Sequence, residues 1–169
     1  RSQLEAAITP KTRMLILCSP SNPTGSVYSK EELKALADVI LSHDDLFVLA
    51  DEIYEHINYV GKHESIAQFP GMKERSIIVN GVSKAYAMTG WRIGYIAAPE
   101  WIVKGCNKLQ GQYTSGPCSV SQKAAEFAYT SDQQCVEDMR QAFERRREGK
   151  TNIYFLADDH VRSIIETIS

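Results

Sequence analysis

Four short apolar runs and one amphipathic segment set the pattern of the first hundred residues. The runs occupy residues 13–18, 46–50, 76–79 and 93–98. Unbroken apolar runs of this length are typical of strands buried on both faces of a parallel sheet. Between the first two runs, Ser29 and Glu32 match a capping box. A helical stripe then follows, made of Leu33, Leu36, Ala37, Ile40 and Leu41. The pattern predicts an α/β domain with a mostly parallel sheet covered on both faces.

The second half of the chain changes to helical periodicity. Residues 100–113, 119–131 and 132–148 predict three helices, and the charged stretch 144–148 indicates a solvated helix face. Gly149 is a plausible C-cap for the last of them. Beyond it, the sequence predicts only an apolar stretch at 153–157 and a short helical pattern at 161–168.

Composition narrows the class of protein. The chain has 169 residues, 43% of them hydrophobic and 24% charged, which is typical of one globular domain. The net charge of −2 argues against a nucleic-acid partner, which usually meets a basic surface. No run approaches the roughly 18 apolar residues of a membrane span. The chain begins with Arg1, and the first methionine, Met14, lies inside an apolar run, so we expect a piece of a longer protein.

Cysteine and histidine spacing predicts no metal site. The four cysteines have no CxxC pair or zinc-type framework, so we expect reduced thiols. The four histidines are scattered among polar neighbours, and none has HExxH spacing.

Polar residues with distinct chemistry follow the first three apolar runs. They are Asn22, Asp51, Tyr54, Ser83, Lys84 and Arg92. In open α/β sheets, ligands bind beyond the carboxyl ends of the strands, so these side chains are expected at one edge. Each alone has a simpler interpretation: a turn, a helix cap, a half-buried aromatic, or a surface cation. Their joint order at strand ends favours a binding site.

This set of groups suits pyridoxal 5'-phosphate. A lysine on a loop can form a Schiff base with an aldehyde cofactor. The cofactor also needs an acid beside its ring nitrogen, a hydrogen-bond donor at its phenolic oxygen, and cations or hydroxyls at its phosphate. The residues at the predicted edge supply each of these.

Three segments carry a family resemblance. SNPTG at 21–25, DEIYEH at 51–56 and SKAYAMTGWRIGY at 83–95 resemble the class I/II aminotransferases, the fold-type I pyridoxal-phosphate enzymes, and most closely the bacterial aspartate aminotransferase type. The resemblance covers about residues 1–148. It implies that this part is the centre of a large cofactor-binding domain, a three-layer α/β/α structure with its four strands adjacent, and that 149–169 is a divergent or truncated tail.

The resemblance also implies a role for most of these residues. Lys84 corresponds to the Schiff-base lysine and proton carrier. Asp51 corresponds to the partner of the pyridine nitrogen. Tyr54 and Asn22 correspond to the residues that contact the phenolic oxygen of the cofactor.

The phosphate-binding residues match less completely. Arg92 corresponds to the family's phosphate-binding arginine. A hydroxyl residue often stands three positions before the family's lysine, where this chain has Gly81. We therefore assign that role to Ser83.

The resemblance implies transamination between an amino acid, of aspartate type, and a 2-oxo acid, by a cytoplasmic homodimeric parent enzyme. Both partners are small molecules. Two alternatives stay open: another fold-type I chemistry, such as a C–S lyase or decarboxylase, and a catalytically silent fragment or regulatory domain. A nucleotide-binding domain is disfavoured because GxGxxG and GxxxxGK loops are absent. We expect the chain alone to be inactive, because the family's N-terminal and C-terminal substrate-binding parts find no match in it.

Overall fold

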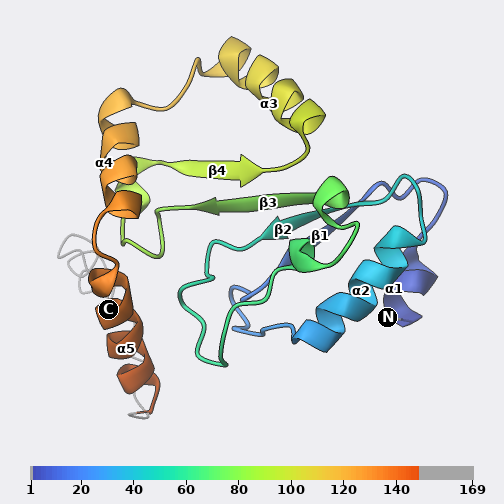
Figure 1. Ribbon diagram of the computed structural model, residues 1–169, viewed down its shortest axis with the longest axis horizontal. Helices are drawn as coiled ribbons and strands as arrows, with labels where there is room; N and C mark the ends of the chain where they lie inside the picture. The colour runs from blue at the N-terminus through green and yellow to red at the C-terminus, as the bar shows by residue number, and fades with distance from the viewer. Residues whose placement is uncertain (1, 149–169) are drawn as a thin grey trace, which may run out of the picture.

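A four-stranded sheet forms the centre of the computed structural model, which describes residues 2–148 (Figure 1). Its strands lie in the order β1 (Met14–Cys18), β2 (Phe47–Asp51), β3 (Ser76–Gly81) and β4 (Gly94–Ala97). β1, β2 and β3 are parallel, and β4 runs antiparallel to β3. The expectation of an α/β fold with a mostly parallel, continuous sheet is confirmed.

The direction of β4 follows from the connection that leads into it. Parallel neighbours need a crossover of a dozen or more residues, usually through a helix. Between β3 and β4 the chain forms only the short 3-10 turn η3 (Thr89–Trp91) and then folds back. The strand therefore returns beside β3 in the opposite direction, an arrangement that the apolar pattern did not specify.

One face of the sheet is covered by α2 (Lys30–Leu41), and the short α1 (Ser2–Ala7), which the sequence pattern missed, lies beside α2. The capping box predicted for α2 is present. The Ser29 hydroxyl accepts a hydrogen bond from the Glu32 backbone N–H at 3.1 Å, and the Ser29 N–H donates to the Glu32 carboxylate at 2.8 Å. Two of the unpaired N–H groups at the helix start are thereby satisfied.

The hydrophobic core lies between α2 and the sheet. The segment that contains η1 (Ile66–Gln68) and ends at η2 (Lys73–Arg75) also contributes side chains to this core. Burying each large aliphatic side chain here contributes roughly 1.5–3 kcal/mol. The buried members are Leu17, Leu33, Ala37, Ile40, Leu46, Val48, Ala50, Ile66, Phe69 and Met72.

The opposite face is covered only at its rim by the described residues. The helix α3 (Glu100–Tyr113) begins beside the sheet, where Trp101 packs edge-on against Phe47 with ring centroids 5.7 Å apart. On β1, the side chains of Met14 and Ile16 remain 43% and 73% exposed. The predicted cover on both faces is therefore complete on one face alone within residues 2–148.

The helices of the second half agree with the sequence pattern. α3, α4 (Ser119–Thr130) and α5 (Gln134–Glu148) begin and end within two residues of the predicted ranges. Tyr129 of α4 packs edge-on against Tyr86 and Tyr95, which ties α4 to the loop after β3. None of the helices described here is both long and apolar enough to cross a membrane. The predicted C-cap at Gly149 and the patterns at 153–157 and 161–168 lie outside the described residues.

All four cysteines are free thiols.

Candidate active site

Three loops meet beyond the carboxyl ends of the parallel strands, at the left end of the sheet in Figure 1. In the register of the sheet, Cys18 lies opposite Asp51, and Asp51 lies opposite Val79. β1 and β2 therefore end level with one another, β3 runs two residues further to Gly81, and the segments that follow the three strands emerge at one edge. This is the edge where open α/β sheets bind ligands.

Asn22 and Tyr54 join the first two of these loops. The Asn22 side-chain amide donates to the Tyr54 hydroxyl at 3.1 Å, across 32 residues of sequence. The loop that presents Asn22 is closed by a hydrogen bond from Gly25 N to the Ser21 carbonyl at 2.7 Å, with Gly25 at φ +69°. Asn22 and Tyr54 also line a pocket of about 240 Å³.

Lys84 joins the third loop to the second. Its ammonium nitrogen lies over the Tyr54 ring, 5.5 Å from the centroid. A cation in this position is attracted by the negative face of the ring. The lysine sits in a turn in which Ala87 N donates to the Lys84 carbonyl at 3.2 Å. An amide, a phenol and an amine from three loops are thus brought into contact.

Asp51 ends β2 beside this group. Its carboxylate accepts a hydrogen bond from Ile53 N at 3.2 Å, which is a local turn contact. No α-helix follows it, since the next described helical turn is η1. The simpler interpretation of Asp51 as a helix cap is therefore excluded.

Ser83 and Arg92 lie on the Lys84 loop, and the contacts described for them stay within that loop. The Ser83 carbonyl accepts from the Thr89 hydroxyl at 3.0 Å. Arg92 is exposed, adopts a left-handed backbone conformation at φ 56°, and donates from its guanidinium to the Thr89 carbonyl at 2.9 Å. The phosphate-binding roles of Ser83 and Arg92 stay predictions, because none of these contacts joins them to Tyr54 or Asn22.

Close backbone contacts explain why position 81 is occupied by glycine. A Cβ at this position would lie 2.7 Å from the Ile93 carbonyl oxygen and 2.9 Å from Gly94 Cα, both backbone atoms of the neighbouring strand region. Two glycines face each other there, because Gly81 pairs with Gly94 in the β3–β4 register. A hydroxyl residue does not fit at this point in this chain.

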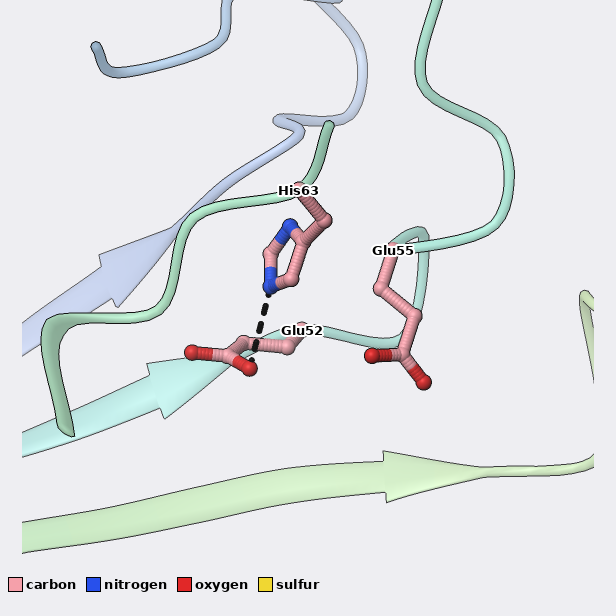
Figure 2. A group of neighbouring side chains, drawn as sticks. All are labelled: Glu52, Glu55 and His63. Carbon is pink, nitrogen blue, oxygen red and sulfur yellow. Dashed lines mark ion pairs between the residues drawn. The ribbon is translucent and has the colours of Figure 1, made fainter. Parts of the chain in front are cut away.

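A polar network behind the Tyr54 turn was missed by the sequence reasoning. Glu52 is buried, accepts from the Ser65 hydroxyl at 2.6 Å, and lies 3.1 Å from His63 Nε2. Glu55 accepts from the Asn80 amide at 2.8 Å. Figure 2 shows the two glutamates leaving the same turn while His63 approaches from a separate segment. Only the fold brings these residues together, so their scattered sequence positions gave no signal.

Ligand atoms of Glu52, Glu55 and His63 lie within 4.8 Å of one another, the spacing of a potential cation site (Figure 2). Each carboxylate already receives a hydrogen bond from a protein group, the Ser65 hydroxyl or the Asn80 amide. The two carboxylates are therefore satisfied within the chain, whereas both ring nitrogens of His63 are buried and have no hydrogen-bond partner among the described residues.

The contact between Glu55 and His56 favours the charged form of both side chains. The hydrogen bond from His56 lowers the pKa of Glu55 below its usual value, and the positive charge of His56 and the Asn80 amide act in the same direction against the cost of burial. The same contact, at 3.3 Å, raises the pKa of His56. Glu55 is consequently an anion at neutral pH.

The fold and the loop-borne lysine define an α/β protein with a candidate binding site at the strand ends. A sequence model of the family described as aminotransferase class I and II matches residues 1–153. The chain therefore belongs to the class I and II aminotransferases.

Relatives and solved structures agree with this membership. The chain is 54% identical over 146 residues to aspartate aminotransferase of Geobacillus stearothermophilus, covering 85% of this chain and 37% of that protein. It is 51% identical over 149 residues to the bifunctional aspartate aminotransferase and glutamate/aspartate-prephenate aminotransferase of Petunia hybrida, covering 86% and 31%. The crystal structure of the aspartate aminotransferase from Rhizobium meliloti matches with a TM-score of 0.84 at 47% identity, covering 87% and 37%. The chain thus spans about a third of the length of these relatives.

Proposed function

We propose that this chain is the cofactor-binding part of a pyridoxal 5'-phosphate-dependent aminotransferase that exchanges an amino group between an amino acid, of aspartate type, and a 2-oxo acid. The observation that carries the proposal is the contact of Asn22, Tyr54 and Lys84 at the ends of the parallel strands. Membership of the aminotransferase family supports it. The names of the relatives support the aspartate type.

The donor set fits this cofactor. Because Asn22 donates to the Tyr54 oxygen, the Tyr54 hydroxyl keeps its own proton available for an oxygen of a bound ligand. Asp51 offers a carboxylate whose orientation is fixed by Ile53 N, as a protonated ring nitrogen requires. When bound, pyridoxal phosphate supplies an aldehyde and a ring that stabilises negative charge on the substrate.

Lys84 performs two tasks in this proposal. Its amine provides the nucleophile that attaches the cofactor, and it then takes up and returns a proton at its nitrogen. The Tyr54 ring beneath the amine restricts where that nitrogen can move. Asp51 holds a proton on the ring nitrogen through its negative charge. Ser83 and Arg92 are proposed to contact the phosphate.

The assembly and location of the parent protein are part of the same proposal. We expect a homodimer in the cytoplasm that acts on small-molecule substrates. The relatives' names support the substrate class alone.

Covalent trapping tests the function. The chain is incubated with pyridoxal phosphate, reduced with borohydride, digested, and analysed by mass spectrometry. We expect the label on the peptide that contains Lys84, and its loss in Lys84→Ala. Lys104→Ala serves as a matched control, because Lys104 is an exposed lysine on α3 that pairs with Glu100 at 2.8 Å.

Labelling that is spread over the surface lysines and is unaffected by Lys84→Ala would contradict the proposal. An assay of the parent enzyme with aspartate and 2-oxoglutarate then separates transamination from elimination or decarboxylation, whose products differ.

A further inference from the structure

Asn80 is a buried amide that links two of the three loops. It lies near the end of β3 and is only 6% exposed. Its oxygen accepts a hydrogen bond from Gly81 N at 2.8 Å, and its nitrogen donates to Glu55 Oε1 at 2.8 Å. A backbone N–H can only donate and a carboxylate can only accept, so these partners fix the orientation of the amide. Asn80 therefore connects the start of the Lys84 loop to the turn that carries Tyr54.

The turn with Tyr54 is held by a carboxylate on each side. Glu52 precedes it and is bound by the Ser65 hydroxyl at 2.6 Å. Glu55 follows it and is bound by Asn80. Figure 2 shows both glutamates leaving this turn. The Glu52 contact ties the turn to the segment after it, whereas the Glu55 contact ties it to the strand that leads to Lys84.

We propose that Asn80 and Glu55 are positioning residues of the active site, and that their hydrogen bond sets the distance between the Tyr54 ring and the Lys84 amine. The inference deepens the proposed function and rests on it for its catalytic meaning. The ring and the amine come from separate loops and lie 5.5 Å apart. Their mutual position therefore depends on whatever holds the two loops together.

The chemistry of the bond suits this role. It is a charge-assisted hydrogen bond, stronger and more directional than one between neutral groups. Asn80 is buried, and the Glu55 side chain is 30% exposed, so water competes weakly for the contact. Its effect on Tyr54 is short-range, because Glu55 is the next residue along the chain.

The test exchanges the hydrogen-bond donor and acceptor between positions 80 and 55. Asn80→Asp keeps an acceptor for Gly81 N but sets a second carboxylate against Glu55, so the two loops should separate. Glu55→Gln in that background restores a donor opposite the new acceptor. Glu55→Gln alone keeps an acceptor oxygen for Asn80 and is the conservative variant.

The readout is the nuclear magnetic resonance signal of the Lys84 ε-methylene protons in the lysine-labelled chain without cofactor, identified by its loss in Lys84→Arg. A ring face next to these protons shifts their signal upfield from the position of exposed lysines. We expect Asn80→Asp to lose most of that shift, the double variant to recover it, and Glu55→Gln to retain it. A purely stabilising role would change the melting temperature and leave the shift in place.

Asp138→Ala is the matched control, because it removes a comparable amide–carboxylate bond, from Gln134 at 2.9 Å on α5. Its Lys84 signal should stay unchanged. A folded Asn80→Asp variant with an unaltered Lys84 signal overturns the proposal. If that variant does not fold, the double variant decides: recovery of fold and signal supports the proposal, and failure of either overturns it. If the shifts behave as expected while covalent trapping fails, the proposed function is wrong and the positioning contact still holds.

Discussion

At the residue scale, the space around Gly81 shows how a single backbone position can shape a site. The strand β4 approaches β3 so closely here that no side chain fits, and the loop to Lys84 starts directly afterwards. The sequence resemblance marked this position as a departure from the family pattern. The structure supplies the cause, a contact between strands that no local pattern encodes.

We predict that Gly81→Ala destabilises the protein by about 1–3 kcal/mol, the usual cost of forcing an extra carbon into a filled space. The backbone atoms that the new Cβ would meet cannot rotate away. Urea denaturation measures the change in the free energy of unfolding. Gly105→Ala on α3 is the control: nothing lies within 4 Å of its Cβ position, and a helical glycine replaced by alanine should gain about 0.4–1 kcal/mol. Equal effects of the two variants would contradict the steric argument.

The Glu55–His56 pair predicts a pH dependence of stability. The pKa of Glu55 is lowered in the folded protein, so its contribution is present above the unfolded value of 4.5 and is lost as the pH falls through the folded value. The pKa of His56 is raised, so its contribution is present below the unfolded value of 6.5 and is lost as the pH rises through the folded value. The contact should stabilise the protein most between these two values.

Melting curves from pH 3 to pH 9 check this expectation by comparing the unaltered chain with Glu55→Gln, at roughly one-unit steps because a titration spans about two units. The difference in melting temperature should be largest between the two unfolded pKa values and should shrink on both sides. A constant difference would show that the charges of the pair do not matter.

At the element scale, α2 and β4 mark what the sequence could and could not predict. The capping box and apolar stripe of α2 are local signals, because each contact lies within one helical turn. The direction of β4 depends on how the connection from β3 folds back, and α1 lies against α2; the apolar pattern encodes neither. The same division holds for the candidate site. The sequence predicts Asn22, Tyr54 and Lys84 because they follow strands, and the structure places them close together, whereas Asn80 and His63 stand out only through their neighbours in space.

We predict that Ser29→Ala costs about 1 kcal/mol of stability, because it removes the acceptor for the Glu32 N–H at the start of α2. Denaturant unfolding provides the measurement. Ser119→Ala is the comparison, since Ser119 is an exposed first-turn residue of α4 and should change stability by less than about 0.5 kcal/mol. A Ser29→Ala variant as stable as the Ser119 variant would show that the cap contributes little.

At the scale of the whole molecule, apolar surface is concentrated on the sheet face opposite α2 and on the outer helices. Ile16 is 73% exposed, and Tyr113 and Phe127 are 84% and 73% exposed. Exposed apolar patches of this kind favour association. β1 is also an edge strand of the sheet formed by residues 2–148, and an exposed strand edge is a second cause of association.

We predict that the 169-residue chain binds a hydrophobic dye and associates as its concentration rises. Ile16→Lys should weaken both effects, because it places a charge at the centre of the exposed face of β1. Dye fluorescence and sedimentation velocity are the measurements, and Lys34→Arg on the surface of α2 is the control. A monomer that does not bind the dye would contradict this view of the face.

The hairpin-like return of β4 has a consequence for the order in which the protein folds. Pairing Gly81 with Gly94 closes a short loop, and short loops lose little chain entropy on closure. The contact between Asn22 and Tyr54 instead spans 32 residues and must wait for β1 to dock. Lys84 would then be positioned early, on the loop between β3 and β4, and the Asn22 amide would join the site last. Binding competence would appear only at the end of folding, so a partly folded chain would expose the lysine loop without the groups that select a ligand.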